Sequence, residues 1–217
     1  MAIVYHSFLS LFLPFIWIFY FYKKDRHPEP KIWLFLAFLL GIISAFLAYY
    51  VEGLLNPFVS ENKFLKFLLF SFIEEFFKFI LIWFFIFPQK IFDEPIDAMI
   101  YMMFAAWGFA FLENFVLITK PSSLAIYSPV SILFLRFLGA NLLHILASAL
   151  IGYGYAFLIK TRRIFPFVFS FATGSFLHFF YNYLIISLPP GFILVLPILW
   201  TAFLVVLSKL NYLAENG

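Results

Sequence analysis

The sequence predicts an all-α bundle of about seven transmembrane helices. Of its 217 residues, 65% are hydrophobic and only 12% are charged, whereas a soluble domain is about half apolar and about a quarter charged. Apolar runs recur along the chain, each near the roughly 20 residues that a membrane-crossing helix needs. Short polar segments separate these runs. We therefore expect one polytopic integral-membrane domain over residues 1–217, solvated by the lipid bilayer.

The expected spans are residues 2–22, 32–51, 63–87, 96–118, 130–159, 164–187 and 191–210. The first run has no Lys or Arg before it and Lys23-Lys24 after it, the reverse of a secretory signal peptide, so we expect it to be retained. Pro189-Pro190-Gly191 either joins the last two spans or marks a re-entrant bend. Basic residues are densest at 23–31 and 160–163, which predicts a cell-membrane protein with its N-terminus outside and its C-terminus in the cytoplasm.

The composition also excludes several kinds of site. The chain has no Cys, which excludes disulfides, thiol nucleophiles and thiolate metal sites. The net charge of +3 is small and comes mainly from the loops. It therefore fits membrane orientation better than nucleic-acid binding.

Polar side chains interrupt four of the spans. An ionised group at the bilayer centre costs on the order of 3 kcal/mol or more, so such groups face the bundle interior and usually serve a function. The polar residues in these spans are Glu74, Glu75, Lys78, Glu113, Asn114, Arg136, Asn141, His144, Ser148, His178 and Asn182.

Helical spacing places these side chains on common faces. Lys78 follows Glu74 by four residues and Glu75 by three, so it can neutralise one carboxylate and leave the other free. His178 and Asn182 are also four residues apart and point to one spot. Alternating span directions and a helical rise of about 1.5 Å per residue predict one polar cavity in the outer half of the membrane. The residues expected at its depth are Glu75, Glu113, His144 and His178.

This set of side chains favours hydrolysis by activated water, in either of two forms. A divalent metal such as zinc could generate hydroxide, or a glutamate could act as general base while His and Asn182 assist the oxyanion. No HExxH motif is present, and a nucleophilic Ser148 is disfavoured because small residues are common at helix contacts. The candidate metal ligands are Glu75, Glu113, His144 and His178.

The remaining charged residues receive simpler interpretations. Arg136 either counters a buried glutamate or extends toward the membrane surface. Loop acids are expected to act as turn or cap groups, with Asp97 capping the fourth span. The others in this class are Glu29, Asp93 and Glu94.

Four motifs occur in a fixed order along the chain. They are EExxK at 74–78, GFAxxEN at 108–114, HxxxSxxxGY at 144–153 and HxxxN at 178–182. This set resembles the PrsW family of bacterial and archaeal membrane proteases, which is related to the CAAX prenyl proteases and to the APH-1 subunit of gamma-secretase. The resemblance extends over about residues 23–182.

The resemblance implies an intramembrane endopeptidase that cleaves a membrane-anchored protein, such as an anti-sigma factor, on its extracytoplasmic side. It implies that Glu74 and Glu75 are the essential glutamate pair. It also assigns Glu113, His144 and His178 to the other polar positions of the family. Two alternatives remain open: a proton- or ion-coupled transporter, since buried ionisable residues also form relays, and a non-catalytic scaffold subunit like APH-1.

Overall fold

The computed structural model describes residues 2–119, 129–187 and 191–216, and this part of the chain is helical throughout apart from short connections. Helices α5, η1 and α6 follow one another without a break, so the described residues form seven helical rods, and the predicted all-α bundle is confirmed. The elements are α1 (Ala2–Tyr22), α2 (Lys31–Val59), α3 (Lys63–Phe85), α4 (Pro95–Thr119), α5 (Pro129–Arg136), the π-helix η1 (Phe137–Asn141), α6 (Leu142–Thr161), α7 (Ile164–Ser187) and α8 (Gly191–Asn216).

Five helical segments are long and apolar enough to cross a membrane. They are Lys31–Val59, Pro95–Thr119, Val130–Thr161, Ile164–Ser187 and Ile193–Glu215. Helix α1 has 21 residues, and its segment Phe8–Tyr22 is also apolar. Helix α3 has 23 residues, but Glu74, Glu75 and Lys78 lie in its middle. Its composition is therefore that of a helix with one strongly polar face.

Helix α2 is longer than expected. The segment 52–62 contains Gly53, Asn56 and Pro57 and was predicted to be a polar connection, yet the helix continues to Val59. Pro57 removes one backbone donor, and the residue four positions earlier, Gly53, is exposed, so its carbonyl remains accessible to polar solvent. The extension brings Glu52 into a helix. The predicted bend at Pro189-Pro190 lies outside the described residues.

Helix α4 lies at the centre of the bundle and packs against α2 on one side and α6 on the other. Small residues permit this close packing. A Cβ atom on Gly41 of α2 would lie 2.0 Å from the carbonyl oxygen of Ala105, and one on Gly152 of α6 would lie 2.5 Å from that of Ala98. Helices α3 and α7 pack against each other, and α7 also packs against α6. Side chains of α3, α4, α6 and α7 can therefore meet inside the bundle.

The outer helices present apolar side chains to their surroundings. Among the described residues, α1, α2, α3, α7 and α8 each expose several large hydrophobic side chains, whereas none on α4 or α6 is exposed. The most exposed examples include Phe58, Phe165 and Ile193. Water would disfavour such a surface and lipid would solvate it, which agrees with a membrane protein.

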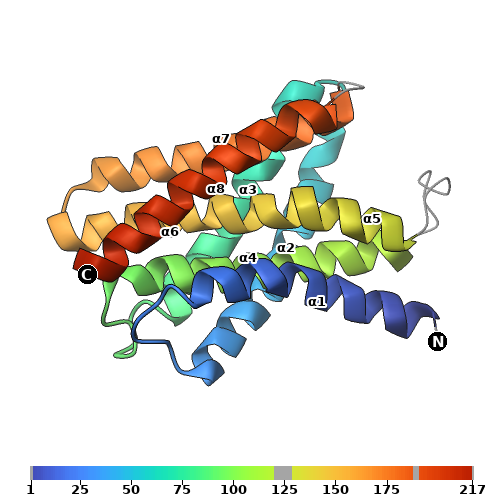
Figure 1. Cartoon of the computed structure of the whole chain (residues 1–217). Coiled ribbons are helices and arrows are strands. Elements are labelled where there is room, and N and C mark those ends of the chain that lie inside the picture. Colours follow the sequence, from blue (N-terminus) through green and yellow to red (C-terminus); the bar gives the residue numbers. More distant parts are fainter. Residues whose placement is uncertain (1, 120–128, 188–190, 217) are drawn as a thin grey trace.

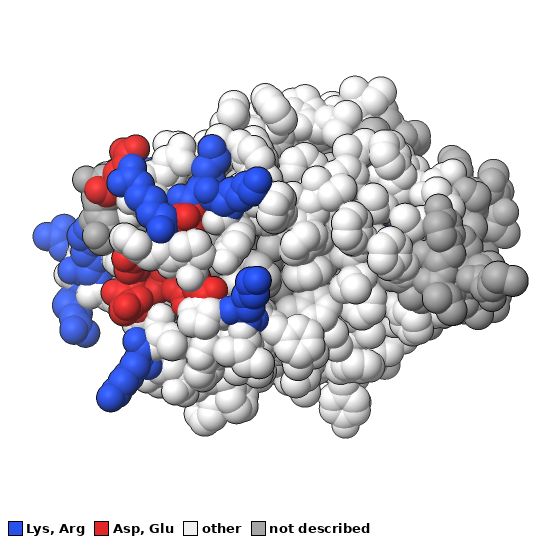
Figure 2. Space-filling model, turned by 60° about the horizontal axis from the view of Figure 1, so that its bottom comes forward, with Lys and Arg blue, Asp and Glu red and all other residues white. Residues whose placement is uncertain are grey.

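The two ends of the bundle differ. The chain begins at one end and finishes at the other, where the α1–α2 and α3–α4 connections also lie (Figure 1). On the face seen in Figure 2, Lys, Arg, Asp and Glu side chains gather at this second end. His27 and Glu94 join the two connections there, with 2.7 Å between Nδ1 and Oε1. We call it the charged end.

Candidate active site

Helix α3 contributes one buried polar stripe. Ser71, Glu74, Glu75 and Lys78 recur at spacings of three and four residues and are all buried. Because residues at these spacings share one face of a helix, the stripe turns away from the exposed apolar face of α3 and toward the bundle interior. The polar residues that interrupt this helix therefore lie where four helices meet.

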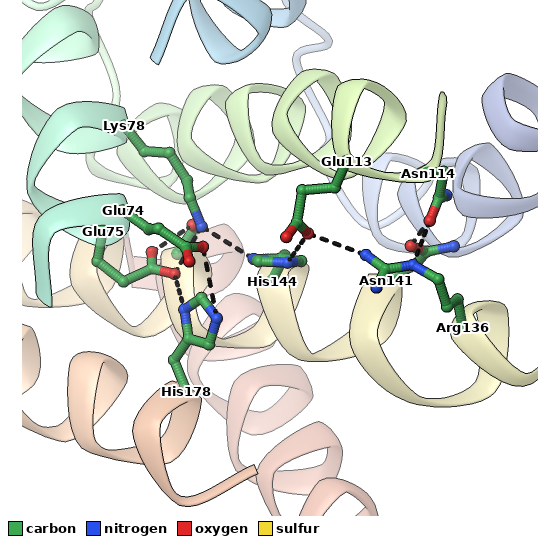
Figure 3. Close-up of polar contacts among 10 residues, drawn as sticks. Glu74, Glu75, Lys78, Glu113, Asn114, Arg136, Asn141, His144 and His178 are labelled. Atoms are coloured by element: carbon green, nitrogen blue, oxygen red, sulfur yellow. Dashed lines mark hydrogen bonds and ion pairs between the residues drawn. The ribbon is translucent and has the colours of Figure 1, made fainter. Parts of the chain in front are cut away.

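Glu75 is held by three side chains from three helices. Lys78 donates to its Oε1 at 2.6 Å, and Ser148 of α6 donates to its Oε2 at 2.8 Å. His178 Nδ1 of α7 lies 2.9 Å from Oε1. Lys78 therefore neutralises Glu75, three residues before it, and not Glu74, four residues before it (Figure 3).

Glu74 keeps a carboxylate oxygen free. Its Oε2 lies 3.5 Å from His178 Nε2, yet it has no hydrogen-bond partner among the described residues. A buried carboxylate oxygen without a partner is costly. Such an atom beside an imidazole indicates a position prepared for a ligand or a reacting group.

The second half of the cluster centres on Glu113. Its Oε2 lies 2.6 Å from His144 Nε2 and accepts a hydrogen bond of 2.9 Å from Arg136. Arg136 also donates to Asn114, and Asn114 donates to Asn141 at 3.1 Å. Of the two roles considered for Arg136, the structure therefore supports pairing with a buried glutamate.

The π-helix η1 separates the residues of this half. Arg136 precedes it, Asn141 ends it, and His144 lies in the first turn of α6. π-helical turns are frequent at functional sites, because one inserted residue changes which side chains share a face. At Gly139 a Cβ atom would lie 2.4 Å from the hydroxyl oxygen of Tyr181, so a larger residue there would displace the Tyr181 side chain.

Lys78 connects the two halves into one network. Its ammonium group lies 3.1 Å from His144 Nδ1, and the rings of His144 and His178 are 4.6 Å apart. An ammonium group only donates, so Nδ1 of His144 accepts and Nε2 carries the proton given to Glu113. Figure 3 shows the resulting chain of contacts.

A cavity of about 550 Å³ opens beside this network. Helices α2 and α4 supply most of its walls, and its apolar lining includes Ala45, Phe46 and Phe109. The charged side chains on its walls are Glu52, Glu74, Glu113 and Arg136. Such a cavity can receive an extended apolar segment and bring it to the free oxygen of Glu74.

Glu52 was not singled out by the sequence analysis, because the segment after residue 51 was expected to be a loop. The continuation of α2 places it on the cavity wall. Asn182, which was predicted to assist catalysis, is partly exposed one turn beyond His178. It makes no hydrogen bond to the glutamates or histidines within the described part of the chain.

Three of these side chains could hold a metal ion. One oxygen of Glu74 and one nitrogen each of His144 and His178 all lie within 4.8 Å of one another, and all three residues are buried. Two His and one Glu form a common donor set for catalytic zinc, and the unpartnered Glu74 oxygen fits this interpretation. Glu75 and Glu113, also named as ligands from the sequence, lie outside this triad and contact His178 Nδ1 and His144 Nε2, respectively.

Curated relatives resemble this chain over much of its length. Protease PrsW of Geobacillus kaustophilus is 29% identical over 174 residues, which cover 77% of this chain and 74% of the relative. Protease PrsW of Oceanobacillus iheyensis is 26% identical over 203 residues, which cover 91% of this chain and 90% of the relative. Protease PrsW of Clostridioides difficile is 34% identical over 122 residues, which cover 53% of this chain and 51% of the relative. No solved structure matches the chain.

The family comparison includes the whole network described above. Residues 29–208 match the family described as PrsW family intramembrane metalloprotease. This range contains the residues that line the cavity and the group that we call the Glu–His cluster, which consists of Glu74, Glu75, Glu113, His144 and His178. The chain therefore belongs to the PrsW family of intramembrane metalloproteases.

Proposed function

We propose that this membrane protease cleaves a membrane-anchored protein with water activated by the Glu74, His144 and His178 cluster. The observation that carries the proposal is the pairing within the cluster. One nitrogen of His178 contacts the Glu75 carboxylate, and one nitrogen of His144 contacts the Glu113 carboxylate. One nitrogen of each imidazole and one oxygen of Glu74 lie within 4.8 Å.

Carboxylate–imidazole pairs of this kind orient metal ligands and fix their tautomers. Glu74, His144 and His178 would hold the metal once His144 Nδ1 is released from Lys78, and Glu75 and Glu113 would orient the two imidazoles. When bound, a zinc-like ion lowers the pKa of its water and polarises the scissile carbonyl. Lys78 also donates to the Glu75 oxygen that contacts His178.

Glu113 also suits the role of proton acceptor. His144 and Arg136 both contact its Oε2, and 34% of its side chain is exposed on the cavity wall. Its Oε1 could take the proton that the attacking water releases and pass it to the leaving amine. Arg136 lines the same cavity, so its positive charge could stabilise the oxyanion.

We further propose the orientation that the sequence predicts, with the charged end in the cytoplasm. Glu113 lies in the second half of α4, toward the opposite end from the α3–α4 connection. An outward-facing site of this kind would cut a single-span substrate near its extracytoplasmic side, as the resemblance to the PrsW family implies. Membership in a protease family favours this function over a transporter.

The test uses purified protein in detergent. Its metal content is measured by mass spectrometry, and cleavage of a single-span reporter with an extracytoplasmic domain is followed before and after chelation. We expect about one metal per chain, loss of cleavage on chelation, and loss of both in Glu74→Gln and His178→Ala. Glu61→Gln, an exposed acid outside the cluster, is the matched control. Wild-type cleavage by Glu74→Gln would remove Glu74 from the mechanism.

A further inference from the structure

A second group of acidic side chains lies at the charged end, away from the cavity. Glu29 comes from the α1–α2 connection, Asp93 from the α3–α4 connection, and Asp97 from the first turn of α4. One carboxylate oxygen of each lies within 4.8 Å of the others. Asp97 and Glu113 lie on the same helix and are separated by about 24 Å along its axis at a rise of 1.5 Å per residue. This group is therefore separate from the Glu–His cluster.

Two members of the group are almost completely buried. Glu29 is 5% exposed and Asp97 is 1% exposed. Asp97 Oδ2 accepts hydrogen bonds from the backbone N–H groups of Asp93 at 3.1 Å and Glu94 at 2.8 Å. Its Oδ1 has no hydrogen-bond partner among the described residues. Asp97 therefore ties down the connection before α4, as a capping group would, and still has an unused oxygen.

The neighbouring Asp25 shows the same pattern. It is 7% exposed, its Oδ1 accepts from the N–H of His27 at 3.0 Å, and its Oδ2 has no partner in the described part of the chain. Asp97 and Asp25 thus each have one buried carboxylate oxygen with no hydrogen-bond donor, although buried carboxylates normally need a counter-charge.

One neutral donor reaches Glu29. Tyr101 donates its hydroxyl to Glu29, which satisfies one oxygen and adds no positive charge. His27 is directed to Glu94, and 75% of its side chain is exposed. The group therefore combines oxygen ligands with unused buried lone pairs.

We propose that Glu29, Asp93 and Asp97 bind a hard divalent cation of the Mg²⁺ or Ca²⁺ class. Both ions prefer carboxylate oxygens, and Ca²⁺ accepts irregular sets of such ligands. The site has no His or Cys, which the softer transition metals favour. Because the ligands come from the α1–α2 and α3–α4 connections, the ion would fasten these connections to the start of α4. Its role is structural and independent of proteolysis.

The experiment measures thermal unfolding of the purified full chain in detergent after treatment with a chelator. CaCl₂ or MgCl₂ is titrated at constant ionic strength. We expect a saturable rise in the unfolding midpoint, since an ion that binds only the folded state stabilises it. The ion that half-saturates at the lower concentration is the one that the site prefers.

Asp93→Asn is the most informative variant, because Asp93 is exposed and its side chain can change without repacking. We expect it to raise the half-saturating concentration at least about tenfold. Glu61→Gln, an exposed acid between α2 and α3, should respond like wild type. So should His178→Ala, which alters the Glu–His cluster and leaves this group intact.

A second measurement does not depend on unfolding. Tb³⁺ replaces Ca²⁺ at such sites and is excited by nearby aromatic rings, so Tyr101 should sensitise it. We expect luminescence that Ca²⁺ displaces and that Asp93→Asn weakens. Each of three outcomes would overturn the proposal. NaCl of equal ionic strength could shift the unfolding midpoint as much as the divalent salt does. Asp93→Asn could respond like wild type, or His178→Ala could lose the response.

Discussion

Replacing Lys78 with Met tests whether the buried Lys78–Glu75 pair holds the site together. Both side chains are fully buried, and Nζ lies 2.6 Å from Oε1. At an effective dielectric constant of about 20, two unit charges at this separation attract by about 6 kcal/mol. Much of that attraction offsets the cost of removing both charges from water. Removing only Lys78 leaves the desolvation cost of Glu75 in place.

The expected loss in the free energy of unfolding for Lys78→Met is therefore about 3–5 kcal/mol. Ser148 and His178 remain as donors to Glu75, which favours the lower part of this range. The double variant Lys78→Met with Glu75→Gln removes both charges, so it should recover at least about half of the loss.

The assay is equilibrium unfolding in mixed detergent micelles, with helicity as the signal. Cleavage of the reporter is measured in parallel. The double variant should be folded and inactive, because Glu75 no longer orients His178. Stability equal to wild type in Lys78→Met, or no recovery in the double variant, would refute the reasoning that Lys78 compensates a buried charge.

Three further predictions address packing, chemistry and orientation. Gly152→Val should destabilise the bundle by about 1–3 kcal/mol, because its Cβ would lie 2.5 Å from a backbone carbonyl of α4, whereas Gly53→Ala, with nothing within 4 Å, should be neutral in the same unfolding assay. Glu113→Gln should lower the cleavage rate at least about 100-fold while the metal content by mass spectrometry stays near wild type; a large loss of metal would instead assign Glu113 to holding the metal, directly or through His144. Because the chain has no Cys, Glu61→Cys should react with an impermeant maleimide in intact cells and Lys24→Cys only after lysis, and the opposite pattern would invert the proposed orientation.

The sequence predicted the helical rods and the polar face of α3 because both depend on local composition. It left open which carboxylate Lys78 neutralises, since spacings of three and four residues both permit contact. The structure selects Glu75, where Ser148 and His178 also donate. Those donors belong to α6 and α7, so the selection depends on tertiary packing, and the free oxygen of Glu74 is its consequence.

The end of α2 shows a different limit of sequence reasoning. Gly53, Asn56 and Pro57 are residues typical of turns, and they predicted a loop that the structure replaces with helix. A proline near the end of a helix removes only one hydrogen bond, and tertiary packing can outweigh that loss. Because the extension of α2 was not predicted, Glu52 was not identified as a site residue. Only the cavity that it lines indicates a role for its charge.

The π-helix changes how Arg136 is placed relative to Asn141 and His144, which follow it. In a regular α-helix, residues three apart lie side by side. In the structure, Asn141 contacts Asn114 and His144 contacts Glu113. Asn141 and His144 therefore both turn toward α4, where they contact neighbouring residues. Gly139 lies in the π-helical turn, and a Cβ atom there would meet the hydroxyl oxygen of Tyr181, so the turn before His144 packs directly against α7.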